Sequence, residues 1–495
     1  MNNNNIKDKI LTTLGNNKVV VLFVLLCIAA IWASGSPLTF VGGELFTRIG
    51  RNGFTVLALL IPVLAGMGLN FGITIGAVAA QFAMFWVIYW GFTGLSGWLL
   101  ALVLATPIAM FLGYLVGALF NRMKGSEMIA GLVLGYFADG IYQFIFLFVI
   151  GGLIPMSEAS GMIISGGVGV KNTIDLTGNL KYALDNVSML NLALVAFIVA
   201  IVVAIARVVL ASRKGEKPNY KQSLLIAVVA VVLYALTYVP AIEQFLAADR
   251  LRLMNAVMIA LAVVVIKQLI DIVTFKMGKA KRDYKVKKSI ALIIVCAIFY
   301  ALTYIPAIEQ VLMWVSIPVA TYLAIVALCF FNSWLLRTRL GQDMRTVGQS
   351  RTVANAAGIN VDRTRIIAMV LSTVLACWGQ LIYLQNIGTF STYGAHTQVG
   401  QFAIAALLVG GASVRKATNK QAIIGVILFH TLFIVAPQAG KELFNNAQLG
   451  EYFRVFVAYG VIAVSLAMHA WKTVPKKKDE EKKEETKETP AITEA

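Results

Sequence analysis

The chain has 495 residues, of which 59% are apolar and 13% are charged, and its mean hydropathy is +0.79. A typical soluble domain is about half apolar and a quarter charged, so these values disfavour a soluble enzyme, a nucleic-acid binder or a fibre and indicate a membrane protein. The apolar runs are continuous, which excludes a transmembrane β-barrel because its strands alternate in polarity.

The N-terminal 18 residues are polar, and the apolar run that follows has no small-residue cleavage site. This pattern predicts a retained anchor rather than a removed signal peptide. A helix that spans a bilayer needs roughly 20 apolar residues. On that basis the sequence predicts helices at about 19–36, 98–120, 128–151, 188–210, 223–239, 253–275, 289–305, 313–335, 366–387, 396–414, 421–438 and 452–471.

A further apolar stretch at 54–91 is too long for one helix and is interrupted by GMGLNFGITIG at 66–76. If the N-terminus is cytoplasmic, the inner loops hold 25 Lys and Arg residues and the outer loops hold 7. The positive-inside rule favours this orientation, which also explains the net charge of +18 without nucleic acid. To keep this orientation, the stretch 54–91 must either cross the membrane twice or enter it and return to the same side. We therefore expect an all-α polytopic membrane protein with about fourteen crossings, interrupted or re-entrant helices, and both termini cytoplasmic.

An internal repeat interrupts this pattern. The sequence YALTYVPAIEQFL at 234–246 recurs as YALTYIPAIEQVL at 300–312, with 11 of 13 positions identical at an offset of 66. A tandem repeat of this kind predicts a duplicated unit, here a helical hairpin. The predicted organisation is a cytoplasmic N-terminus (1–18), a first permease core (19–210), inserted duplicated hairpins (211–312), a second permease core (313–471) that includes a cytoplasmic segment (337–365), and a disordered charged tail (472–495).

Motifs for catalysis are absent from the sequence. There is no GxxxxGK[ST] phosphate loop, HExxH or GxSxG, so we expect no catalytic or metal-binding residues. The four cysteines lie within apolar runs, as small core residues do. The chain is therefore expected to be no enzyme and to bind no cofactor, and any ATP hydrolysis would occur on a separate chain.

Candidate residues for a solute pathway lie where a helix is interrupted by glycine or carries a charge inside the membrane. Freed backbone groups can face a substrate at such interruptions, although close helix packing through glycine is the alternative. A charge within the membrane is expensive and suggests function. These criteria select Asn70, Gln81, Asp139 and Gln401.

The cytoplasmic segment 337–365 is polar and cationic. It could form a short helix, turn at Gly358 and dock into a groove of another protein. The alternative is an ordinary basic loop that satisfies the positive-inside rule.

At this point the residues resemble a known family, the permease subunits of ATP-binding-cassette (ABC) importers for ribose-type sugars, nucleosides and branched-chain amino acids. The stretch MRTVGQSRTVANAAGINV at 344–361 is similar to the family's LRAVGENPxAAxxAGINV. AIAALLVGGAS at 403–413 looks like AIAAVVLGGTS, and 125–141 is similar to the nucleoside-type branch, which we favour. The resemblance implies that the cytoplasmic segment couples to an ATPase through Gly341, Arg345, Val347, Gly348, Ala354, Gly358, Ile359 and Asn360.

The resemblance also implies partners and a location. The partners are a cytoplasmic ABC ATPase that uses ATP, an extracytoplasmic solute-binding protein that would dock on the outer loop at 152–187, a second permease subunit (identical or a paralogue) and membrane lipid. The location is the cytoplasmic (inner) membrane of a bacterium. The expected cargo is a small polar solute, a nucleoside or monosaccharide first, with a riboflavin-like compound or branched-chain amino acid as alternatives. An ion-coupled secondary transporter is the competing class, but it needs sets of intramembrane carboxylates.

Overall fold

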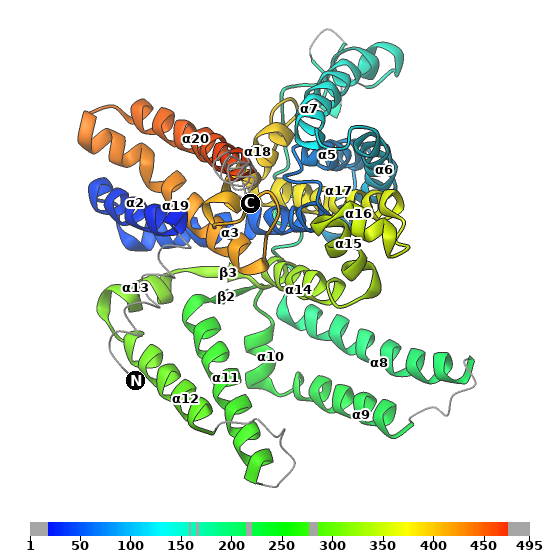
Figure 1. Ribbon diagram of the computed structural model, residues 1–495. Coiled ribbons are helices and arrows are strands. Elements are labelled where there is room, and N and C mark those ends of the chain that lie inside the picture. The colour runs from blue at the N-terminus through cyan, green and yellow to red at the C-terminus, as the bar shows by residue number, and fades with distance from the viewer. Residues whose placement is uncertain (1–17, 158–159, 165–167, 214–219, 277–285, 474–495) are drawn as a thin grey trace, which may run out of the picture.

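The computed structural model describes residues 18–157, 160–164, 168–213, 220–276 and 286–473. The predictions for the N-terminal 17 residues and for 474–495 lie outside these ranges. The described residues form a helical protein with four short strands (Figure 1). Its elements are α2 (Lys18–Ser34), α3 (Leu38–Ala58), α4 (Leu60–Leu64), α5 (Ile73–Tyr89), α6 (Gly94–Arg122), α7 (Glu127–Phe144), the π-helix η1 (Ile145–Leu153), β1 (Thr173–Asp175), α8 (Met189–Arg213), α9 (Tyr220–Leu236), α10 (Pro240–Leu246), β2 (Arg250–Arg252), α11 (Leu253–Lys276), α12 (Val286–Leu302), α13 (Pro306–Trp314), β3 (Ser316–Pro318), α14 (Val319–Leu335), α15 (Arg339–Gln349), α16 (Arg351–Ala356), α17 (Val361–Ile387), β4 (Thr389–Ser391), α18 (Ala395–Val409), α19 (Asn419–Phe444) and α20 (Ala447–Thr473).

Six of the described helices are long and apolar enough to cross a membrane, and nine spans result if each sharply bent pair is counted as one. Three further apolar helices are shorter, at 19–34, 73–89 and 395–409. The protein is thus a polytopic helical membrane protein, as the composition predicts.

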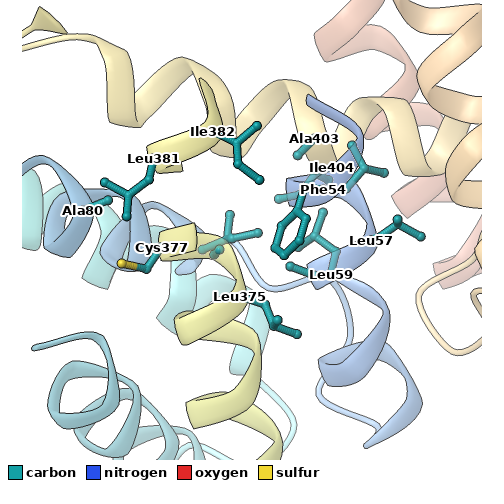
Figure 2. Close-up of a cluster of buried hydrophobic side chains, with 14 of the residues drawn as sticks. Phe54, Leu57, Leu59, Ala80, Leu375, Cys377, Leu381, Ile382, Ala403 and Ile404 are labelled. Carbon is teal, nitrogen blue, oxygen red and sulfur yellow. The ribbon is translucent and has the colours of Figure 1, made fainter. Parts of the chain in front are cut away.

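Helix α17 is the centre of the bundle, and α3, α5 and α6 pack against it. Small residues let these helices approach closely. A Cβ on Gly76 of α5 would lie 2.5 Å from the carbonyl oxygen of Thr373, and one on Gly113 of α6 would lie 2.9 Å from Cα of Val370. Figure 2 shows the apolar core between α3, α5, α17 and α18, which includes Phe54. Glycine therefore brings backbones together here, as it commonly does between membrane helices.

The stretch 54–91, which is too long for one helix, forms two antiparallel helical segments, the end of α3 with α4 and, after a turn, α5. Helix α3 runs antiparallel to α17, because Arg51 bonds Asn386 near the end of α17 while the Ala58 carbonyl accepts a bond from Ser372, further back. The chain turns at 65–72, and α5 returns alongside α17. The stretch thus forms two antiparallel helical segments, and its two membrane crossings stay a prediction.

Helix α3 begins at Leu38, 16 residues before the predicted start at Phe54. The polar residues Glu44, Arg48 and Arg51 lower the hydropathy of its first half and hide it from an apolar-run criterion. Nε of Arg51 donates a 2.9 Å hydrogen bond to Oδ1 of Asn386 in α17. Part of this charge is therefore satisfied inside the protein.

The two copies of the repeat fold alike. In each copy a helix ends at a bend of 90° or 87° before the short helix α10 or α13. Strands β2 and β3 follow and pair antiparallel, with Leu251 opposite Ile317, its equivalent 66 positions later. The Leu253 amide also bonds the Val315 carbonyl, and the equivalent Val319 amide bonds the Asp249 carbonyl. The duplicated units are thus related by a local twofold axis through the Leu251–Ile317 pair.

Two helix pairs, α8 with α9 and α11 with α12, extend away from the rest of the bundle (Figure 1). The most apolar window of α11 contains no buried residue, and only 6% of that of α8 is buried. These helices therefore add apolar lateral surface and contribute little to the core around α17. The predicted insertion starts at 211, but α8, which pairs with α9, begins at Met189.

Candidate functional site

A pocket with a volume of about 30 Å³ lies between α5, α7 and α18. Its polar lining groups include the side chains of Thr74, Tyr136, Thr397 and Gln401. Two of its walls approach each other through glycine, since a Cβ on Gly400 of α18 would lie 2.7 Å from the Thr74 methyl group. The lining residues are Phe71, Thr74, Leu132, Gly135, Tyr136, Thr397, Gly400, Gln401 and Ile404.

Next to this pocket, Asp139 of α7 meets a histidine from α18. Nε2 of His396 lies 2.6 Å from Oδ1 of Asp139, and Gln143 donates to Oδ2 at 3.1 Å. His396 is fully buried, whereas the Asp139 side chain is 20% exposed. The ring of Tyr142 contacts His396 edge-on at 4.9 Å. Asp139 therefore has a partner 257 positions away and remains partly exposed.

The other predicted pathway residues lie near the same helices. Asn70 lies in the turn before α5, and Gln81 lies on α5; both are buried, and their amide atoms have no hydrogen-bond partner among the described residues. Gln401 lines the pocket and accepts a 2.8 Å bond from the hydroxyl of Tyr459 in α20. The amide of Gln380 on α17 is also fully buried without a partner in this part of the chain. Unpaired buried amides are costly in apolar surroundings, and they mark where a polar solute or water would find partners.

The segment 337–365 folds into α15, α16 and a turn at Gly358, which agrees with the first of the two alternatives that its sequence leaves open. Val347, Ala354 and Val361 are buried together, with Ile359 packed on them. Gly358 adopts φ +75°, in the left-handed region that suits glycine. The side chain of Asn360 caps α17 by accepting a 2.9 Å bond from the Arg363 amide. Several of the family-motif positions thus determine the shape of the segment.

Other motif positions bring this segment to its neighbours or leave it open to solvent. A Cβ on Gly348 would lie 2.2 Å from the Leu64 carbonyl oxygen, and one on Gly341 would lie 1.9 Å from the Leu335 carbonyl oxygen. Gly348 therefore places α15 directly against the turn at 65–72, which leads into the pocket. Arg345 and most of α16 are exposed, including Val353 at 59%. This exposed surface is available to a partner.

A charged cluster joins α16 to the bundle. Oε1 of Glu127, the first residue of α7, lies 2.5 Å from Nη2 of Arg351 in α16 and 2.5 Å from Nη2 of Arg365 in α17. Arg365 is fully buried and the Glu127 side chain is 7% exposed. Glu127 lies in the stretch 125–141, which is similar to the nucleoside-type branch and matches it at this glutamate, but the sequence does not pair it with either arginine.

At the opposite end of the bundle, the buried carboxylate of Asp185 accepts hydrogen bonds from three side chains. Gln385 donates at 2.9 Å, Asn386 donates at 2.8 Å, and the hydroxyl of Thr321 in α14 donates as well. Nearby, β1 pairs with β4. The loop before α8 is thus fixed to the end of α17 and to the first turn of α14.

We predict that Asp185→Ala lowers the free energy of unfolding by about 3 kcal/mol, because three buried donors lose a charged acceptor. Thermal unfolding of the purified protein in detergent measures this effect. Glu243→Ala serves as the control, since Glu243 is exposed and its loss should change stability little. Equal unfolding temperatures for the two variants would contradict the prediction.

Sequence reasoning missed His396, Arg351 and Arg365 as parts of the site. His396 lies in the first turn of α18, within a polar stretch of the sequence, and both arginines lie in the cationic segment. Nothing in a single sequence indicates which residue 220 or more positions away each of them contacts. The sequence signal that identified Asp139, a charge within an otherwise apolar run, is absent around these three residues.

Taken together, the features define a polytopic membrane protein with a polar pocket between helices and a folded, exposed segment attached to the pocket walls. A family model described as "Branched-chain amino acid transport system / permease component" matches residues 144–466. The chain belongs to this family, and the resemblance to ABC permease subunits seen in the sequence is confirmed.

Several known proteins are similar to parts of the chain. The nucleoside ABC transporter permease NupB of Lactococcus lactis is 26% identical over 176 residues, which are 35% of this chain and 45% of NupB. NupC of the same organism is 27% identical over 200 residues, 37% of this chain and 61% of NupC. The L-arabinose permease AraH of Escherichia coli is 26% identical over 141 residues, 28% of this chain and 41% of AraH. The chain thus matches less than two thirds of each of these relatives. No solved structure matches the chain.

Proposed function

We propose that this chain is the membrane permease subunit of an ATP-driven ABC importer. The observation that carries the proposal is the attachment of α15 and α16: their exposed surface offers a contact for an ATPase, while Gly348 and Arg351 hold the turn before α5 and the start of α7. Both of these elements line the pocket. A partner that moves the segment would therefore move two walls of the solute pathway. ATP would be bound and hydrolysed by that partner.

The proposed topology has fourteen crossings, with both termini in the cytoplasm of a bacterium and the chain in its inner membrane. The relative directions of the helices around α17 support it. Trp98 near the start of α6 bonds the Leu381 carbonyl, and Asn121 near its end bonds the Asp362 carbonyl, so α6 runs antiparallel to α17. The distribution of Lys and Arg among the loops supports the same orientation.

The proposed cargo is a nucleoside or a monosaccharide. In this conformation the pocket has room for about one water molecule, so it must widen to admit the cargo. Its lining offers hydroxyl, amide and aromatic groups, and Asp139 has an exposed part that can accept bonds from solute hydroxyl groups. Relatives include permeases named for nucleosides and for L-arabinose. A riboflavin-like compound or a branched-chain amino acid is the alternative within this class.

The proposed partners are a solute-binding protein and a second permease subunit. The solute-binding protein would dock on the outer segment at 152–187, which includes β1 and Asp185, and the second permease subunit completes the importer.

The coupling role is tested by substitution at Gly358. We expect Gly358→Val to reduce uptake strongly, because a β-branched residue is strained at φ +75° by about 1–2 kcal/mol and the turn would change the angle of α16. Gly358→Asn is the matched control, since asparagine tolerates this conformation and the position has open space around it. Initial uptake of labelled uridine and ribose, at equal expression, is the measurement. Full uptake by the valine variant would remove the coupling role.

One observation favours a second candidate, an ion-coupled secondary transporter. Asp139 and His396 form a buried acid–histidine pair, a combination used in proton relays. This class predicts that an uncoupler which collapses the proton gradient stops uptake in vesicles that contain the chain alone. Uptake that needs an ATPase and survives the uncoupler favours the importer.

A further inference from the structure

The carboxylate of Glu127 is fully engaged at the junction of three segments. Oε1 accepts hydrogen bonds from Arg351 of α16 and Arg365 of α17, and Oε2 accepts a 2.8 Å bond from the Gly125 amide. Arg365 also donates to the Phe120 carbonyl of α6 at 3.4 Å. One buried carboxylate thus ties the start of α7 to the exposed segment and to the central helix.

Charge makes this junction hard to open. Nε and Nη1 of Arg365 are buried without a hydrogen-bond partner among the described residues. Arg365 is therefore left with Glu127 as its charged partner, and separating them would leave a buried charge unpaired, which is strongly unfavourable. Arg351 shares the same carboxylate oxygen, so moving α16 away from α7 removes one of the two cations that this carboxylate binds.

A second ion pair on the same face provides the contrast. Nζ of Lys124, between α6 and α7, lies 2.7 Å from Oδ1 of Asp362 in α17. Its side chains are 42% and 56% exposed, and surface pairs of this kind contribute little. This pair does not include α15 or α16. It therefore shares the location and charge type of the Glu127 cluster but lacks the link to the exposed segment.

We propose that Glu127 is a positioning residue that transmits displacement of α16 to α7 and thereby changes the pocket that α7 lines. The inference rests on the proposed function, because it assumes that a partner displaces α16. Leu132, Gly135 and Tyr136 lie about one and a half to two and a half turns along α7 from Glu127, and all three line the pocket. A rigid helix pulled at its first residue moves these groups together.

The test places a fluorescent reporter on α7 outside the pocket. Gly140 is exposed, and a Cβ there meets nothing within 4 Å, so Gly140→Cys carries an environment-sensitive bimane label. The background replaces the native cysteines by alanine, namely Cys27, Cys296, Cys329 and Cys377. The full chain, in complex with its ATPase in lipid nanodiscs, is measured with and without ATP and vanadate. Glu127→Gln, Glu127→Asp and Asp362→Asn are then introduced one at a time.

We expect ATP and vanadate to shift the emission in the parent protein and in Asp362→Asn. In Glu127→Gln the shift should be lost while ATP hydrolysis continues with an unchanged KM for ATP, and Glu127→Asp, which keeps the charge, should restore part of the shift. A shift that persists in Glu127→Gln overturns the inference. If Glu127→Gln fails to fold, Arg351→Gln replaces it, since Arg351 is 34% exposed, and a persisting shift there overturns the inference equally. A parent protein that binds no ATPase would instead contradict the proposed function.

Discussion

Replacing Gly348 by alanine is expected to reduce ATP-driven uptake by about tenfold or more. The added Cβ would lie 2.2 Å from the Leu64 carbonyl oxygen and 3.1 Å from the Gly66 amide nitrogen. Both neighbours are backbone atoms, which cannot rotate away as a side chain can. Helix α15 must therefore separate from the turn at 65–72, so that it no longer touches the pocket wall directly.

Uptake of labelled uridine and ribose into proteoliposomes that contain the ATPase and the solute-binding protein measures this effect. Gly43→Ala is the matched control, because Gly43 lies in a helix and a Cβ there meets nothing within 4 Å. ATP hydrolysis should persist in Gly348→Ala while uptake falls, since the substitution separates the segment from the pocket and leaves the exposed surface of α15 and α16 in place. Full uptake by Gly348→Ala would show that the close approach of α15 to the turn is not needed.

The second large effect is expected at the Asp139–His396 pair. Asp139→Leu and His396→Leu should each lower the free energy of unfolding by about 2–4 kcal/mol, because the first leaves the buried His396 ring without the carboxylate that it contacts and the second leaves the partly buried Asp139 carboxylate with Gln143 alone. The double variant should cost about as much as one single variant, so the two substitutions should be strongly non-additive. Both singles should also lose most uptake if Asp139 contacts the solute.

Thermal unfolding of the four proteins in one detergent gives the coupling energy of the pair. The exposed pair Lys124–Asp362 is the control and should show a coupling energy of about 0.5 kcal/mol or less. Additive losses at Asp139 and His396 would mean that their contact adds no stability. Unchanged uptake in Asp139→Leu would remove this residue from the proposed pathway.

The sequence predicts much of the helical framework because apolar length and loop charge are local properties. The turn at Gly358, the duplicated units and the break of the 54–91 stretch into more than one helix follow from glycine, repetition and length. The first half of α3 is missed because inward-facing Arg51 lowers its hydropathy. An apolar-run criterion cannot distinguish a charged residue that finds a partner inside the protein from one in a loop.

The candidate site is predicted only in part, for a related reason. Asp139 is identifiable as a charge within an apolar run, but its contact with His396 depends on how α7 and α18 pack. Glu127 likewise appears as a motif position, and its link to Arg351 emerges only when α16 is placed beside α7. The symmetry of β2 and β3 follows from the repeat only after the strands are seen to pair with each other.

The most direct test of the account is purification of the tagged chain from cells that also express a candidate ATPase and solute-binding protein, followed by uptake into proteoliposomes. The account predicts that the ATPase co-elutes with the chain and that uptake requires ATP on the side of the membrane where the ATPase is bound. It also predicts that Gly348→Ala keeps the complex but loses uptake. Uptake by the chain alone, driven by an ion gradient and indifferent to ATP, would contradict it.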